Sequence, residues 1–134
     1  MNQPLQFLDS GRVLSPGMPF SEAVRVGDTL YLSGQMGIEP GTMRLVPGGI
    51  REQARQTMEN IKTTLEAHGA TLADVVKCTL MLADINDWHT VNDVYMPYFE
   101  AGRLPARSAF AAQALALGGR VEIECIAVLG TRPA

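Results

Sequence analysis

The sequence has no long hydrophobic segment and no leader-like N-terminus. No apolar run in its 134 residues approaches the roughly 20 residues that a membrane-spanning helix requires. Residues 1–10, MNQPLQFLDS, lack the basic region followed by an apolar region that is typical of a secretory signal. We therefore expect a cytoplasmic protein with no membrane partner.

Cysteine and histidine are scarce in the sequence. The chain contains two of each, and both cysteines, Cys78 and Cys125, fall in apolar segments typical of strands. Buried free thiols are therefore a better prediction than a disulfide. Cysteine and histidine do not cluster with the spacing of a zinc site, so we expect no metal.

Motifs that hold cofactors or activate nucleophiles are also absent. The sequence has no GxxxxGK[ST] phosphate loop, no GxGxxG at the start of a helix and no GxSxG nucleophile motif. We expect no cofactor. Any catalysis would then come from side chains, backbone groups and bound water.

Basic charge is neither dominant nor clustered. The net charge is −3 and the nine arginines are scattered along the chain, which gives no general attraction to nucleic acid. Hydrophobic residues make up 46% of the chain and charged residues 19%, as in ordinary globular proteins. We expect residues 1–134 to form one domain with a buried core.

The apolar pattern predicts an α+β domain in the order β-β-β-α-β-α-β-β. Strand patterns cover residues 3–8, 20–26, 29–33, 75–83, 106–113 and 121–129. A helix is predicted over 50–67, where apolar residues recur at spacings of three and four. A second helix should begin near residues 84–87 and end near Pro97. Its inward residues should be Ile85, Trp88, Val91, Val94 and Tyr95.

The last two predicted strands are expected to form a hairpin, and each carries a charged residue. Arg107 lies in the first and Glu122 in the second. A charge in an apolar strand is costly unless it finds a partner or a ligand. Arginine presents a fork of donors that suits a carboxylate, and glutamate can carry a proton. From this stretch alone, an active site, a simple ion pair and two solvent-facing charges remain open.

The predicted sheet has apolar residues on both faces. Ile126 and Val128 lie opposite the main apolar row of the last strand, and Val75 and Met81 do the same in the strand 75–83. Two helices can cover only one face of a sheet. We therefore expect a homo-oligomer in which the uncovered faces pack together.

Four segments carry a family resemblance: YLSGQ (31–35), EQARQTMENIKTTLEAHGATLADVVKCTLMLADINDWHTVNDVY (52–95), PARSAF (105–110) and VEIECIAV (121–128). With these segments the chain resembles the Rid family of reactive-intermediate deaminases (YjgF type, older name L-PSP endoribonuclease). The resemblance implies a chorismate mutase-like fold, a mixed sheet with two helices on one face. It also implies a homotrimer whose sheets form a central barrel.

The resemblance further implies a reaction and its residues. Rid proteins hydrolyse 2-imino or enamine acids to 2-keto acids and ammonia in clefts between subunits. Arg107 matches the arginine that holds the substrate carboxylate, and Glu122 matches the glutamate that orients or activates water. Glu124, which we expect on the opposite face from Glu122, could share that role. Ser33 beside Gly34, and Asn92 in the second helix, match further pocket residues.

Two positions depart from the family pattern. Phe20 stands where the deaminases have a tyrosine, and Ala109 stands where they have a cysteine. Phe20 could also be a core residue, Ser33 a strand end and Asn92 an ordinary helix residue. The lost hydroxyl at Phe20 favours an alternative function, a module that binds a small carboxylate such as a 2-keto acid without turnover. The acidic chain and the lack of a histidine pair argue against a ribonuclease.

Overall fold

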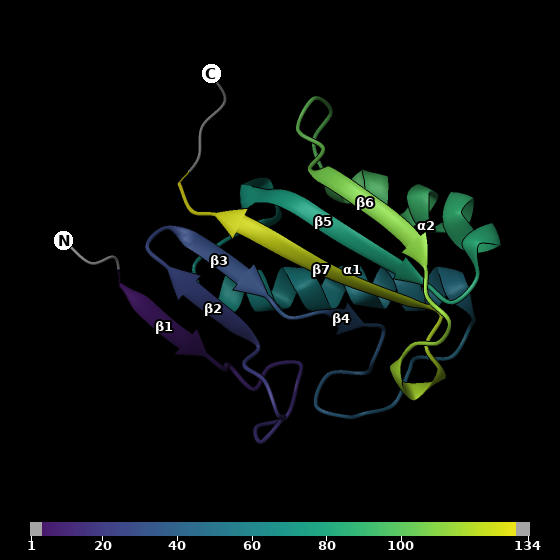
Figure 1. Ribbon diagram of the computed structural model, residues 1–134, viewed down its shortest axis with the longest axis horizontal. Coiled ribbons are helices and arrows are strands. Elements are labelled where there is room, and N and C mark those ends of the chain that lie inside the picture. Colours follow the sequence, from purple (N-terminus) through teal and green to yellow (C-terminus); the bar gives the residue numbers. More distant parts are fainter. Residues whose placement is uncertain (1–3, 131–134) are drawn as a thin grey trace.

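The computed structural model describes residues 4–130. One sheet holds all the strands, and both α-helices lie behind it in the view of Figure 1. The α+β class and the two predicted helices are confirmed. The strands are β1 (Leu5–Leu8), β2 (Ala23–Val26), β3 (Thr29–Leu32), β4 (Gln35–Met36), β5 (Val75–Leu82), β6 (Ala106–Ala111) and β7 (Val121–Val128); the helices are α1 (Ile50–Ala67) and α2 (Trp88–Tyr95).

The strand order is β1-β2-β3-β7-β5-β6, with the short β4 also paired to β7. The β5–β6 pair is parallel and the other pairs are antiparallel, so the sheet is mixed. The predicted hairpin of the last two strands is wrong, because β5 lies between them. Since α2 carries the chain from β5 to the parallel strand β6, β6 becomes an edge strand and β7 fills the other side of β5.

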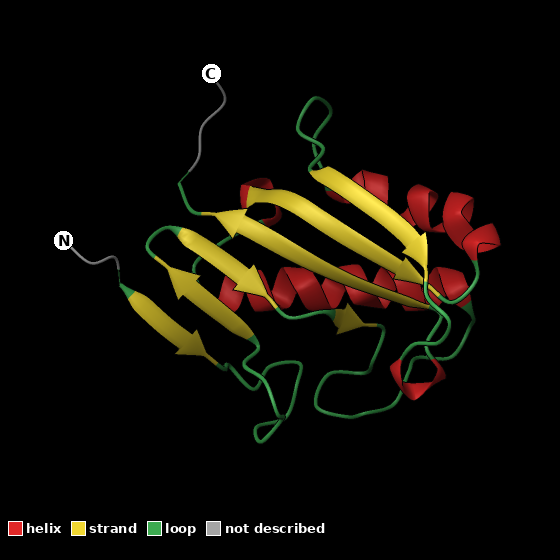
Figure 2. Ribbon diagram, in the orientation of Figure 1, coloured by secondary structure: helices red, strands yellow, loops and turns green. Residues whose placement is uncertain are grey.

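Helix α1 has the predicted bounds, and its apolar stripe packs on the sheet. Met58, Ile61 and Leu65 are fully buried in a core that also contains the inward residues of β5 and β7. Figure 2 shows both helices on the same side of the strands. No helix among residues 4–130 is long and apolar enough to cross a membrane.

The first two residues that were expected to face inward in the second helix depart from the prediction. Ile85 lies in a 3-10 turn before α2 and is 50% exposed, and Trp88 is 37% exposed. The α-helix proper begins at Trp88 with Asp87 as its N-cap, within the predicted range, and its buried face begins at Val91. Val91, Val94 and Tyr95 are buried as predicted.

The first residues of β5 also depart from simple alternation. Val75 pairs with Ala127 and Lys77 with Ile126, which leaves Val76 as the extra residue of a bulge. Val75 is therefore buried and Val76 is 41% exposed, so the expectation that Val75 would face away from the core is wrong.

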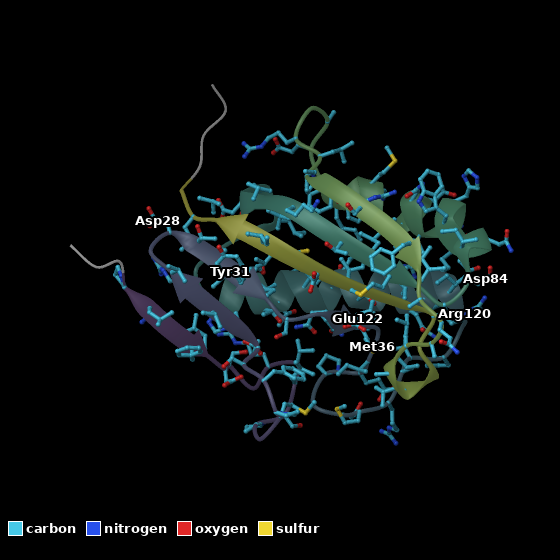
Figure 3. The ribbon with its side chains drawn as sticks, viewed as in Figure 1. Asp28, Tyr31, Met36, Asp84, Arg120 and Glu122 are labelled. Atoms are coloured by element: carbon cyan, nitrogen blue, oxygen red, sulfur yellow. The ribbon has the colours of Figure 1, made fainter. Side chains whose placement is uncertain are left out.

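The sheet face opposite the helices carries exposed aromatic residues and is not covered by any helix among residues 4–130. The registers of β1, β2 and β3 place Phe7 and Tyr31 on this face, and Phe110 joins them from β6. These three side chains are 69%, 47% and 47% exposed, respectively. Tyr31 is labelled in Figure 3 on this near side of the sheet. An exposed apolar surface of this kind is typical of a contact surface.

Candidate active site

Five of the seven predicted site residues border two separate hollows. Arg107 and Asn92 border one hollow of about 220 Å³. Phe20, Gly34 and Glu122 border another of about 180 Å³. These two hollows therefore keep Arg107 apart from Glu122.

Arg107 lies on the helix-facing side of the edge strand β6. Its guanidinium carbon is 5.1 Å from the ring centre of Tyr95 and 5.6 Å from that of Trp88. Cation–π contacts of this kind hold a guanidinium in place while leaving its N–H groups free for an anion. No ion pair joins Arg107 to any carboxylate within residues 4–130. An intrachain salt bridge therefore does not account for this arginine.

Asn92 faces the same hollow from α2. Its side-chain oxygen is buried, and within the described chain it has no hydrogen-bond partner. Buried polar atoms are nearly always paired in folded proteins, so an unpaired one beside a hollow is suited to a ligand. Met96, Leu104 and Pro105 supply apolar walls around it.

Glu122 lies on the helix-free side of β7. It is paired with Met36 of β4, and Figure 3 shows the two residues together where these strands meet. A Cβ atom built on Gly34 would overlap the carboxylate oxygen Oε2 of Glu122 and lie 3.0 Å from its Cδ. Glycine at 34 therefore makes room for the carboxylate.

The environment of Glu122 favours its protonated form. Partial burial raises its pKa above the usual value, and the negative charge of Glu124 raises it further. The two residues pair with Met81 and Thr79 of β5 and share the helix-free face. The expectation that they would face opposite ways is wrong, because residues two apart in a strand share a face. A carboxyl group with a raised pKa is suited to proton transfer.

Phe20 forms part of the wall of the Glu122 hollow and is 43% exposed. It is therefore not a core residue. The rest of the wall is mainly aliphatic or thioether in character. Its members are Leu14, Met18, Met36, Ile38, Met43, Ala116 and Leu117.

Ser33 and Ala109 line neither hollow. The Ser33 hydroxyl donates a hydrogen bond of 2.6 Å to the carbonyl oxygen of Ser21, and its N–H donates one of 3.0 Å to the carbonyl of Glu22. Ser33 thus holds the chain that follows Phe20. Ala109 shares the face of Arg107 on β6 and packs against the core. Contact of either residue with a substrate stays a prediction.

The aromatic support of Arg107 was not predicted from the sequence. Trp88 and Tyr95 were assigned to the core, yet both contact the guanidinium. The available signal was their spacing, since residues seven apart lie on one face of a helix. What the spacing could not reveal is that α2 packs beside β6.

The chemistry available in these two hollows is that of side chains. Within residues 4–130, no three His, Cys, Asp or Glu residues are grouped so that they could hold a metal ion. Arg107 and Asn92 can bind a carboxylate and a neighbouring polar group. Glu122 can exchange a proton with a water molecule or a substrate.

The sequence matches a known protein family. The family described as Endoribonuclease L-PSP matches residues 11–129. The chain belongs to this family. It is also 54% identical, over 84% of its length and 81% of the relative's, to a Bos taurus protein named 2-iminobutanoate/2-iminopropanoate deaminase.

Solved structures of the family have the same fold. The crystal structure of RidA from the Antarctic bacterium Psychrobacter matches 92% of this chain and 99% of its own with a TM-score of 0.86 and 40% identity. E. coli TdcF, solved with bound serine, matches 92% of this chain and 98% of its own with a TM-score of 0.83 and 31% identity. The arrangement of helices and sheet is therefore that of the L-PSP/YjgF (Rid) family.

Proposed function

We propose that this protein is a hydrolytic deaminase that converts 2-imino or enamine acids to 2-keto acids and ammonia. The observation that carries the proposal is the unpaired guanidinium of Arg107, held on two aromatic rings beside an open hollow. Glu122, with its raised pKa, supplies the acid and base. The deaminase names of relatives such as the Bos taurus protein support the same reaction.

The proposed active site lies between subunits of a homotrimer whose sheets form a central barrel. Two observations support this assembly. Phe7, Tyr31 and Phe110 are exposed aromatic residues on the helix-free sheet face, which favours self-association. Arg107 lies on the edge strand β6, where a neighbouring subunit could bring its own Glu122 into reach.

The proposed reaction begins with the substrate carboxylate bound by the fork of Arg107. Glu122 accepts a proton from water as the water oxygen forms a bond to C2 of the imine. That proton passes to the nitrogen, which gives a carbinolamine. The proton of the new C2 hydroxyl group then also passes through Glu122 to the nitrogen, so that the C–N bond breaks, ammonia leaves and the C2 carbonyl forms. One imino acid and one water thus give one 2-keto acid and one ammonia. Holding the reacting atoms together is the main contribution of the protein.

We also propose that the reaction needs neither metal nor cofactor, because a protonated imine carbon is already electrophilic. Full activity after extensive dialysis against a chelator is the expected result. The free thiols of Cys78 and Cys125 agree with a proposed cytoplasmic location.

The test of the proposed function uses an imino acid generated in situ by an amino-acid oxidase. Release of the keto acid should be faster with the protein than in buffer. Arg107→Ala should lower kcat/KM on the order of a hundredfold or more, as the loss of a charged substrate contact does. Arg107→Lys should recover little, since a lysine cannot bind a carboxylate through two parallel hydrogen bonds. No acceleration over buffer, or an Arg107→Ala variant as fast as the parent, would reject the deaminase.

The alternative is a module that binds a 2-keto acid without turnover. Phe20 favours it, because a phenyl ring in the Glu122 hollow offers no hydroxyl to the substrate. Calorimetric binding of a 2-keto acid combined with no rate acceleration would support this function. An endoribonuclease, the older family label, has less support, since the chain carries a net charge of −3.

A further inference from the structure

The hollow beside Glu122 is far more apolar than a site for a small polar acid requires. Glu122 is the sole charged residue in the wall that the structure describes. We propose that this hollow takes the side chain of the substrate. The protein should then prefer 2-imino acids with a large apolar substituent over 2-iminopropanoate. This inference rests on the proposed function and adds the substrate class.

The wall is built from four separate parts of the chain. Met18 and Phe20 come from the segment before β2, Met36 from β4, Met43 from the loop before α1, and Leu117 from the turn before β7. Thioether side chains are flexible and polarizable, so they adapt to apolar groups of different shape. Three methionines around one hollow therefore favour a range of aliphatic, thioether and aromatic substituents.

The size of the hollow fits such substituents. Its volume is about 180 Å³. An apolar protein cavity of roughly 150 Å³ is enough to hold benzene. An isobutyl or benzyl group would therefore fill much of the space, whereas the methyl group of 2-iminopropanoate would leave most of it empty. One additional methylene in an apolar pocket typically changes specificity by roughly 10- to 200-fold.

The backbone conformation of Leu117 also supports an apolar ligand in this hollow. Its φ of 61° makes it the one non-glycine residue with positive φ within residues 4–130. This conformation is strained for a residue with a Cβ atom, and glycine would adopt it without strain. The leucine side chain is 47% exposed at the wall of the hollow, so the core gains little from it. A role in contacting an apolar ligand accounts for leucine at this position.

The turn that carries Leu117 is packed closely against the hollow. A Cβ atom built on Gly119 would overlap Cε of Met36 and lie 3.2 Å from the carbonyl oxygen of Ala116. Glycine at 119 thus lets the turn lie directly against Met36, whose strand partner is Glu122. The apolar wall and the carboxylate are therefore parts of one tightly packed unit.

The experiment compares imino acids made in situ from leucine, methionine, phenylalanine and alanine. The leucine-derived substrate should have a kcat/KM at least tenfold above the alanine-derived one. Met43→Ala and Leu117→Gly should each reduce this ratio several-fold, chiefly by raising KM for the larger substrate. Ile85→Ala is the matched control, because Ile85 is equally exposed but lies outside both hollows. It should change neither the ratio nor the activity.

Binding of the products separates this inference from the proposed function. Calorimetry should show tighter binding of 4-methyl-2-oxopentanoate than of pyruvate, by about tenfold, whether or not the protein is catalytic. Deamination with equal preference for small and large substrates, and equal product affinities, would overturn the inference and leave the deaminase standing. If the protein does not deaminate but still binds the larger product more tightly, the proposed deaminase is rejected and the apolar binding preference is kept. If Met43→Ala dissociates the oligomer while the ratio is unchanged, the wall is a subunit contact and the inference is wrong.

Discussion

Arg107 and Glu122 lie on opposite faces of the sheet. Arg107 is in register with Cys78, which is buried under the helices, whereas Glu122 is in register with Met81 on the helix-free face. Cys78 and Met81 are an odd number of positions apart in β5 and therefore face opposite ways. The chain holds the two charged groups beside different hollows, which is consistent with the proposed site between subunits.

This separation predicts that two inactive variants will complement each other. Arg107→Ala and Glu122→Gln should each be nearly inactive alone. In mixed oligomers, a cleft is intact when its Arg107 comes from a Glu122→Gln subunit and its Glu122 comes from an Arg107→Ala subunit. With random assembly in equal amounts, about a quarter of the clefts meet this condition, so activity should return to about a quarter of the parent level. The measurement is kcat after co-expression or joint refolding.

The double variant provides the control for complementation. Mixed in equal amounts with the parent protein, Arg107→Ala/Glu122→Gln contributes neither group. Intact clefts then form only between two parent subunits and make up about a quarter of the total. If co-refolded single variants stay inactive while the parent recovers under the same procedure, the active site does not lie between subunits.

The elements with a single strong local pattern could be predicted from the sequence. Helix α1 has the predicted bounds, because its apolar stripe records which face packs on the sheet. The bulge at Val76 could not be predicted, because the apolar pattern of a strand does not show whether the strand contains an extra, unpaired residue. Strand neighbours depend on how the chain crosses the sheet, and alternation carries no such information. The expected β6–β7 hairpin failed for this reason.

The sequence offered candidate site residues but not their geometry. Arg107 and Glu122 stood out as charges in apolar strands. Their placement in two hollows follows from β5 lying between β6 and β7, a long-range pairing that no local pattern reveals. The family resemblance indicated Arg107 and Glu122 as site residues, and the register of the sheet places them on opposite faces.

The close approach of Gly34 to Glu122 predicts a sharp effect from one methyl group. In Gly34→Ala, the new Cβ atom would overlap the carboxylate, so Glu122 must move. A displacement of about 1 Å at a reacting group can cost about a hundredfold in rate, and we expect a loss of that order in kcat/KM. Steady-state kinetics with a fixed imino acid would measure it.

Gly41→Ala is a suitable control for this methyl group. Gly41 has a φ of 79° and no atom within 4 Å of an added Cβ. Alanine there should lower stability by about 1 kcal/mol through backbone strain and leave kcat/KM unchanged. Equal activity losses in the two variants would show that Gly34 acts through stability and not through Glu122.

A buried hydrogen-bond contact links the N-terminal segment to the end of α1. Glu22 is 1% exposed, and its carboxylate is 2.6 Å from Nε2 of His68 and accepts a hydrogen bond of 3.0 Å from the Ser10 hydroxyl. Removing one partner of a buried hydrogen bond leaves the other group unsatisfied. We expect His68→Ala to lower the free energy of unfolding by about 2 kcal/mol, measured by urea denaturation at fixed protein concentration.

His89→Ala is the matched control for the histidine substitution. His89 is exposed, and its recorded ring contact is with Trp88. Its loss should change the free energy of unfolding by less than about 0.5 kcal/mol. A His68→Ala variant as stable as His89→Ala would mean that Ser10 and the backbone alone satisfy Glu22.

The raised pKa of Glu122 predicts how activity depends on pH. Attack by water requires the carboxylate form, so kcat/KM should fall as pH decreases through this raised pKa. Burial is the larger cause of the shift and Glu124 the smaller. Glu124→Gln removes the neighbouring negative charge and should therefore move the acidic limb of the profile to lower pH. An unchanged acidic limb would mean that another group controls it.

The same shift affects stability with a definite sign. Because its pKa is higher in the folded chain than in the unfolded chain, Glu122 binds its proton more tightly when folded. Its stabilising contribution is fully present below the unfolded pKa and is lost as pH rises through the folded pKa. At neutral pH the ionised group therefore disfavours the fold. Glu122→Gln should be inactive yet have a Tm equal to or above that of the parent at neutral pH, with the difference shrinking in acid. A lower Tm at neutral pH would show that the carboxylate stabilises the fold, in conflict with the direction of its pKa shift.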